Sequence, residues 1–102
     1  MRQFDLVENP SERSRAIAPY LLVLQSHLLD GADSVIVAPV VRDAERQFAG
    51  IDLSIELQGD RLTVTLVELF SIERGLLKRV CGDLAEYEDQ LRRGLDRLFT
   101  GF

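Results

Sequence analysis

Two alternating runs of apolar and polar residues, separated by a short turn, restrict the fold of this chain more than any other feature of its sequence. Residues 51–57 (IDLSIEL) place an aliphatic side chain at every odd position and a polar one, including Asp52, at every even position. Residues 61–67 (RLTVTLV) alternate again after the turn at 58–60 (QGD). Alternation with a period of two is typical of a strand with one buried face, and two such runs around a glycine-containing turn predict a β-hairpin.

Three earlier segments also have the composition of strands. Residues 4–7 (FDLV) alternate, which predicts a short first strand. Residues 20–26 (YLLVLQS) form a nearly continuous apolar run, typical of a strand buried on much of both faces or lying at a subunit contact. Residues 34–40 (SVIVAPV) contain three β-branched residues in succession and predict a strand that ends at Pro39.

The segments on either side of the hairpin are less regular. Residues 41–50 (VRDAERQFAG) predict a long loop with about one helical turn. Residues 68–72 (ELFSI) are expected to continue or bend the second strand of the hairpin. Residues 76–80 (LLKRV) fit either a short strand or a helical turn.

Residues 83–99 have the pattern of an amphipathic helix, with an apolar stripe formed by Leu84, Tyr87, Leu91, Leu95 and Leu98. Asp83 and Glu86 have the spacing of an N-cap and its capping-box partner, so the helix is expected to begin there. Gly94 lies inside this helix, where glycine costs about 1 kcal/mol relative to alanine. Either another group approaches closely at Gly94 or the cost is tolerated.

The order of these elements, about five to seven strands and then one helix, predicts a mainly β protein of the α+β class. The expected architecture is a small barrel or a curved antiparallel sheet with a C-terminal helix appended. A chain of 102 residues has room for one core, so residues 1–102 are expected to form a single domain.

The charge balance argues against a protein whose main role is to bind phosphate. The chain has 12 Lys and Arg against 17 Asp and Glu, a net charge of -5, whereas nucleic-acid binders usually carry a basic face. Cys81 is the single cysteine, so no intrachain disulfide framework is expected. Residues 1–10 have no apolar core typical of a signal peptide, and a cytoplasmic protein is therefore expected.

The sequence offers no convincing catalytic or metal-binding set. His27 is the only histidine, and its combination with Ser26 or Cys81 has no spacing that marks a nucleophilic site. One histidine and one cysteine are too few for a zinc site, and the glycines are isolated turn residues rather than a phosphate-binding loop. We therefore expect no enzyme activity, no metal and no cofactor.

Residues 98–102 (LFTGF) place two aromatic side chains, Phe99 and Phe102, at the end of the predicted helix and just beyond it. Two interpretations stay open. Either both rings fold back onto the core, or they form a short apolar tip, held out by a rigid helix, that binds the pocket of a partner. Aromatic anchors on rigid supports are typical of binding hot spots.

The chain resembles the CcdB family of toxins from toxin–antitoxin systems over nearly its whole length. Six segments carry the resemblance in a common order: residues 3–4 (QF), 22–30 (LVLQSHLLD), 34–40 (SVIVAPV), 58–60 (QGD), 83–84 (DL) and 98–102 (LFTGF). The resemblance implies an SH3-like barrel or curved sheet, a smaller three-stranded sheet, a long C-terminal helix and a two-fold homodimer.

The resemblance also implies a function and a set of contact residues. Members of the family bind the A subunit of DNA gyrase and trap the enzyme on cleaved DNA, and an antitoxin with a disordered C-terminal segment, of the CcdA type, neutralises them. No direct contact with nucleic acid or membrane is expected. The gyrase-binding residues implied for this chain are Leu28, Leu29, Asp96, Phe99, Thr100, Gly101 and Phe102.

The chain departs from the family at two of these positions, and two other functions stay open. Thr100 stands where the family has a tryptophan, and Asp96 stands where it has an asparagine. One alternative is a non-poisoning dimer that binds only the antitoxin. The other is a toxin of similar fold that cleaves messenger RNA, for which the candidate basic patch is Arg42, Arg46, Arg61, Arg74, Lys78 and Arg79.

Overall fold

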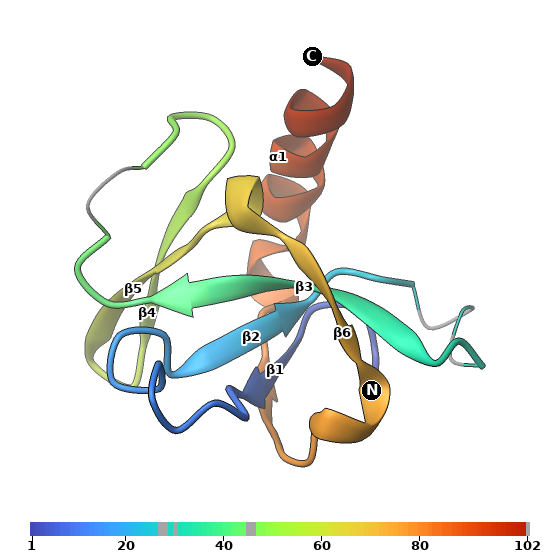
Figure 1. Cartoon of the computed structure of the whole chain (residues 1–102). Helices are drawn as coiled ribbons and strands as arrows, with labels where there is room; N and C mark the ends of the chain where they lie inside the picture. The colour runs from blue at the N-terminus through green and yellow to red at the C-terminus, as the bar shows by residue number, and fades with distance from the viewer. Residues whose placement is uncertain (27–28, 30, 45–46, 102) are drawn as a thin grey trace.

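The fold is taken from a computed structural model, which describes residues 1–26, 29, 31–44 and 47–101. Seven strands and one α-helix lie within these residues: β1 (Asp5–Glu8), β2 (Tyr20–Val23), β3 (Ser34–Val41), β4 (Leu53–Leu57), β5 (Asp60–Val64), β6 (Phe70–Glu73), β7 (Val80–Asp83) and α1 (Glu88–Thr100). Short 3-10 helices connect the later strands: η2 (Leu66–Glu68), η3 (Arg74–Leu76) and η4 (Ala85–Tyr87). In Figure 1, α1 stands beside the sheet with its C-terminal end pointing away from it.

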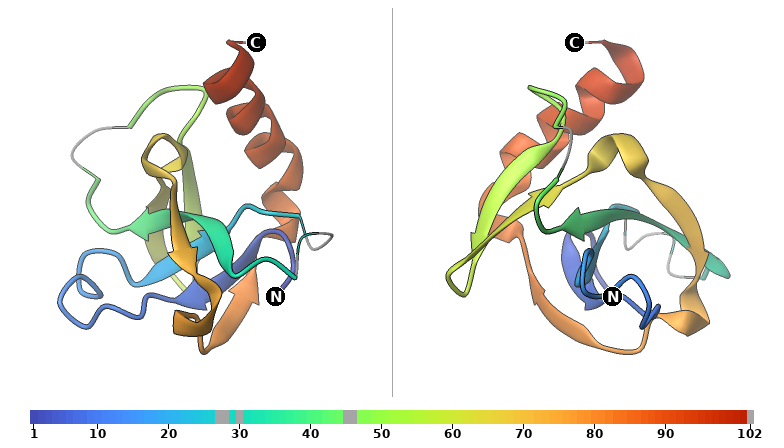
Figure 2. Two further views of the ribbon diagram at one scale, coloured as in Figure 1. Left: turned by 45° about the vertical axis from the view of Figure 1, so that its right-hand side comes forward. Right: turned by 60° about the vertical axis from the view of Figure 1, so that its left-hand side comes forward.

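All seven strands belong to one antiparallel sheet in the order β4-β5-β3-β2-β1-β7, and β6 also pairs with β3. The sheet curls into a half-barrel, which the right-hand view of Figure 2 shows nearly end-on. This confirms the predicted class, a curved antiparallel sheet with a C-terminal helix. The smaller three-stranded sheet is β4 and β5 joined to the last residues of β3, so it is continuous with the larger one.

The predicted hairpin forms as β4 and β5, with Leu57 paired to Asp60. Gln58 and Gly59 make the two-residue turn, and both have left-handed backbones, with φ of 51° and 85°. Two positive φ values are the requirement of the turn type whose twist matches the strands of a hairpin. The local sequence therefore determines this element.

The prediction that the third strand ends at Pro39 is wrong, because β3 continues to Val41. The C=O of Pro39 accepts hydrogen bonds from Thr65, so its nitrogen also points to that side of the strand. On that side β3 pairs with β6 only as far as Val37 and with β5 only from Val40. Pro39 thus lies where the neighbouring strand changes, and its missing N–H breaks no ladder bond.

Other boundaries also differ from the sequence prediction. The first strand begins at Asp5, because Phe4 is buried with a left-handed φ of 69°. The second strand ends at Val23, and the hairpin's second strand ends at Val64, after which η2 bends the chain into β6. Of residues 76–80, Leu76 ends η3 and Val80 begins β7, and the three residues between them belong to neither element. The described residues of 41–50 form a loop after Val41, and at its end the C=O of Phe48 accepts hydrogen bonds from the N–H groups of Ile51 and Asp52, the bonding of a single helical turn.

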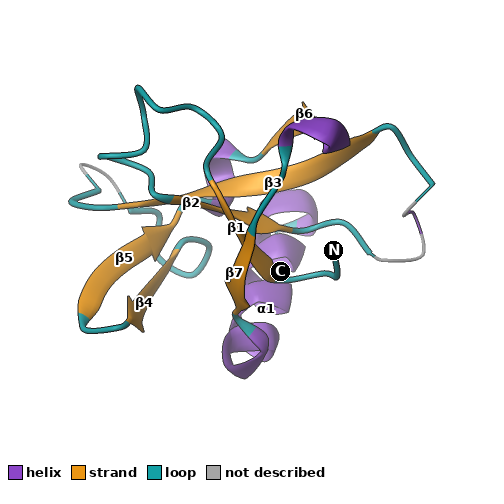
Figure 3. Ribbon diagram, turned by 90° about the horizontal axis from the view of Figure 1, so that it is seen from below, coloured by secondary structure: helices purple, strands orange, loops and turns teal. Residues whose placement is uncertain are grey.

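Two apolar clusters form the core, one on each face of the sheet. The larger lies between the sheet and α1 and includes Leu84 and Leu91. The smaller fills the inside of the curl and includes Val35 and Val37. Figure 3 shows α1 against one face while β6 crosses the other. Among the described residues, no helix is long and apolar enough to span a membrane.

The predicted N-cap is also wrong. Asp83 ends β7, and its carboxylate accepts a hydrogen bond of 2.9 Å from the N–H of Ala85. It therefore begins the 3-10 turn η4, and α1 starts only at Glu88, after Tyr87, which makes no side-chain cap. A sequence pattern cannot distinguish this short 3-10 turn from the first turn of an α-helix, since residues three apart align in both.

Candidate functional site

The last turn of α1 is the site that the sequence singles out, and the body of the protein fixes the helix that carries it. Leu91 is fully buried, and Leu95 packs against the same cluster while remaining half-buried. Arg92 lies over the ring of Phe4, 5.6 Å from its centroid, and donates a 3.2 Å hydrogen bond to Gln3. The first two turns of α1 are therefore held by the core and by the N-terminal segment.

At Gly94, α1 lies directly against the loop before β4. A Cβ at this position would lie 2.6 Å from the carbonyl oxygen of Ile51 and 2.7 Å from Cδ1 of Leu66. The first of these atoms belongs to the backbone and cannot move without displacing the loop. Of the two explanations that the sequence left open for Gly94, the close approach is confirmed.

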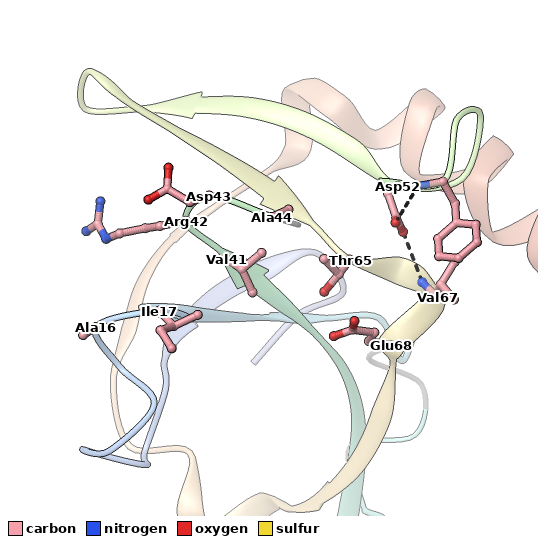
Figure 4. Close-up of a pocket in the computed structure, with 11 residues that line it drawn as sticks. Ala16, Ile17, Val41, Arg42, Asp43, Ala44, Asp52, Thr65, Val67 and Glu68 are labelled. Carbon is pink, nitrogen blue, oxygen red and sulfur yellow. Dashed lines mark hydrogen bonds between the residues drawn. The ribbon is translucent and has the colours of Figure 1, made fainter. Parts of the chain in front are cut away.

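The same loop holds the C-terminal half of the helix. Arg97 donates a 2.9 Å hydrogen bond to the carbonyl oxygen of Gly50. Asp52, which the alternation placed on the polar face, is buried instead: its carboxylate accepts hydrogen bonds from the N–H groups of Phe48 at 3.0 Å and Val67 at 3.2 Å. Figure 4 shows both bonds. The carboxylate thus ties the loop to η2.

Removing the Asp52 carboxylate is expected to loosen this support. Asp52→Ala leaves two backbone N–H groups without their acceptor, and hydrogen bonds to a charged group contribute roughly 1.5–3 kcal/mol. We expect the free energy of unfolding in urea to fall by about 2 kcal/mol, and by less in Asp52→Asn, which retains one acceptor oxygen. Equal stability of Asp52→Ala and the unaltered protein would contradict this role.

The tip of α1 presents an aromatic side chain to solvent. Phe99 is 69% exposed, so the interpretation that this ring folds back onto the core is wrong. Gly101 ends the helix with a left-handed φ of 80°, and its N–H donates to the carbonyl of Arg97. Asp96 and Thr100 are also exposed, and the hydroxyl of Thr100 donates a 2.5 Å hydrogen bond to the carbonyl of Asp96. These four residues form one surface, which we call the helix tip.

The structure separates the remaining predicted contact residues from the helix tip or does not describe them. Leu29 is 55% exposed between β2 and β3, and its carbonyl accepts a hydrogen bond from Arg74 on η3, so it lies beside η3 and not on the helix tip. Leu28, Phe102 and the histidine His27 lie outside the described residues.

Two adjoining hollows lie on the other face of the sheet, and no pattern in the sequence predicts them. One, of about 560 Å³, lies between residues 9–18 and β6, and the other, of about 730 Å³, extends from it toward Asp52 (Figure 4). They share Val41 and Glu68. Four large exposed side chains gather around them: Ile17, Phe48, Phe70 and Leu76.

The candidate basic patch does not form a free cationic groove in the described part of the chain. Arg42 pairs with Asp60 at 3.1 Å, and Arg61 lies 3.6 Å from Glu56. Arg74 donates to the backbone carbonyls of Ala32 and Leu29. Lys78 and Arg79 are exposed beside β7, and Arg46 lies outside the described residues.

Comparison with known proteins agrees with this fold. The family model described as CcdB protein matches residues 3–101. A crystal structure of an Mtb toxin superposes with a TM-score of 0.70 at 18% identity, covering 92% of this chain and 99% of the other. The Mycobacterium tuberculosis toxin MazF-mt6 gives a TM-score of 0.68 at 19% identity, covering 96% of each chain. No curated protein sequence matches significantly.

Proposed function

Because the chain belongs to the CcdB family and is thus a toxin of a toxin–antitoxin system, we propose that it acts on DNA gyrase. It binds the A subunit, traps the enzyme on cleaved DNA, and is neutralised by an antitoxin with a disordered segment. It functions as a homodimer in the cytoplasm, where gyrase is found, and it catalyses no reaction itself.

The exposure of Phe99 is the observation that carries this proposal. A ring that is 69% exposed on the last turn of a helix gains contact area when it enters a pocket, and little entropy is lost, because Gly94 and Arg97 already fix the helix. Asp96 and Gly101 lie beside it on the helix tip. A carboxylate at Asp96 accepts hydrogen bonds only, so the facing groups on gyrase are donors.

Replacing Phe99 tests the proposal. Phe99→Ser removes the aromatic anchor, and loss of an interface hot spot costs about 2 kcal/mol or more, equivalent to roughly a 30-fold loss of affinity. We expect the concentration needed to inhibit gyrase supercoiling, and to accumulate cleaved DNA, to rise by about that factor. The matched control is Val80→Ser on β7, where the side chain is 53% exposed.

Two outcomes would remove the role assigned to the helix tip. Equal inhibition by Phe99→Ser and the unaltered protein would exclude Phe99 as a contact. Equal weakening by Val80→Ser would show that the effect is not specific to the tip. Both side chains are exposed, so neither substitution is expected to change stability by more than about 0.5 kcal/mol.

Thr100 is the observation that favours the non-poisoning alternative. Its hydroxyl bonds to the carbonyl of Asp96 in its own helix, and it has no ring to stack on a partner as the family's tryptophan does. Growth arrest on expression without an antitoxin, together with accumulated cleaved DNA, supports poisoning. Normal growth with folded protein supports a dimer that only binds the antitoxin.

Cleavage of messenger RNA, the activity of MazF-type toxins, is the remaining candidate. The fold is shared with MazF-mt6, but Arg42 and Arg61 pair with acidic side chains, which lowers the positive potential available to a phosphate backbone. Incubation with single-stranded RNA separates the two functions directly. Specific cleavage of the RNA by the purified protein, absent with an inactive variant purified in the same way, would favour the nuclease function.

A further inference from the structure

The hollows beside β6 are an opening in the apolar interior of the curled sheet. Side chains alternate along β3, so Pro39 and Val41 lie on the same face as Val35 and Val37, which are buried inside the curl. Pro39 and Val41 instead line the hollows. We call this surface the mouth groove and define it by Ile17, Leu21, Pro39, Val41, Phe70 and Leu76.

The exposed side chains at the mouth groove are too large and too apolar for an ordinary surface. Ile17 is 66% exposed, Leu76 47% and Phe70 40%, and all three line the two hollows. Large apolar side chains gathered on one exposed surface usually mark a binding site. Neither hollow is lined by a residue of α1, and α1 packs against the other apolar cluster, so the mouth groove is a separate surface from the helix tip.

One wall of the groove is a strand with a free edge. Among the described strands, β6 pairs only with β3. The carbonyl of Ile36 accepts from Leu24, the residue directly after β2, so the backbone groups of Val35 and Val37 point to β6, where they face Ile72 and Phe70. The N–H and C=O of Ser71 therefore point away from β3. An extended peptide added to such an edge forms main-chain hydrogen bonds and places alternate side chains in the groove.

The charged side chains that line the groove indicate the sign of the charge that its occupant carries. Glu68 is shared by both hollows, and in Figure 4 its carboxylate points into the larger one, toward the side of Thr65 and Val41. Neither Glu68 nor Asp43, which lines the larger hollow, makes an ion pair with a described residue, whereas Arg42 is paired with Asp60. Among the described residues that line the two hollows, the charge without an ion-pair partner is therefore negative.

We propose that the mouth groove binds an extended peptide, which adds to β6 as a strand, inserts alternate apolar side chains between Pro39 and Phe70, and places a lysine or arginine against Glu68. This site does not depend on the proposed action on gyrase, because it uses no residue of the helix tip.

A synthetic peptide of about eight residues with alternating leucine and lysine is the probe. We expect it to bind the full chain with a dissociation constant in the micromolar range, measured by fluorescence anisotropy. A peptide of alternating leucine and glutamate should bind at least about 10-fold more weakly, as should one with leucines and lysines grouped in two blocks. Equal binding of all three peptides would overturn the proposal.

Two variants locate the binding site. Glu68→Lys and Phe70→Ser are each expected to weaken binding by about 10-fold or more. The matched control for Glu68→Lys is Glu86→Lys on η4, which makes the same charge change. The matched control for Phe70→Ser is Val80→Ser on β7, which also replaces an exposed apolar side chain with serine. Equal weakening by Glu86→Lys would show that the peptide senses only net charge and would overturn the site.

Amide hydrogen exchange tests the mode of binding. The peptide is expected to slow exchange at Ser71 while leaving α1 unchanged; protection confined to α1 would overturn the proposal.

Sedimentation of Phe70→Ser tests whether the groove is instead covered by a second copy of this chain. A shift of the unaltered protein's oligomer to monomer in this variant would show that a second copy covers the groove, and would also overturn the proposal.

Discussion

Leu91→Ala is expected to lower the free energy of unfolding by about 3–5 kcal/mol, the largest effect of any single truncation on α1. The Leu91 side chain is fully buried in the cluster between the sheet and the helix, so its removal leaves a cavity in the cluster that also contains Leu84 and Leu66. A helix of 13 residues is marginal without tertiary contacts, and loss of this contact therefore destabilises the whole helix.

Urea denaturation followed by far-ultraviolet circular dichroism measures the effect. The same substitution at Leu76, which is 47% exposed on η3, is expected to change stability by less than about 0.5 kcal/mol. Comparable losses in the two variants would mean that α1 is not anchored through Leu91. Gyrase inhibition by Leu91→Ala should also fall, because the helix tip loses its fixed position.

Gly94→Val is expected to destabilise the protein by about 2–3 kcal/mol, although valine is the better helix former. The new Cβ lies 2.6 Å from the carbonyl oxygen of Ile51, a backbone atom that belongs to the same loop as Asp52. Relief of this clash requires either the loop or the helix to move. The substitution should therefore impair the helix tip more than its effect on stability alone predicts.

The matched control is Gly75→Val, because nothing lies within 4 Å of an added Cβ at Gly75 and its backbone needs no left-handed φ. Thermal unfolding and the gyrase supercoiling assay are applied to both variants. A Gly94→Val protein as stable as Gly75→Val would contradict the close approach of the loop to α1. A stable variant with unchanged inhibition would show that the tip tolerates displacement of its helix.

The amino-acid sequence determined the elements whose signal is local. Alternation fixed the hairpin of β4 and β5, because side chains on successive strand residues point to opposite faces, and Gln58 and Gly59 supply the turn. The leucine stripe determined α1 in the same way, because residues three and four apart lie on the same face of a helix. The exposure of Phe99 was one of two interpretations, since a sequence cannot show whether an aromatic ring at the end of a helix folds back onto the core.

Only the tertiary structure decided the features that depend on residues distant in the sequence. Asp52 is buried because Phe48 and Val67 donate to it, although alternation placed it on the polar face. Pro39 stays inside a strand because β6 and β5 leave a gap beside it. The mouth groove exists because the sheet curls without closing, so apolar residues of one periodic face are buried at one end and exposed at the other. Periodicity specifies which face a side chain joins, but only the path of the other strands determines what covers that face.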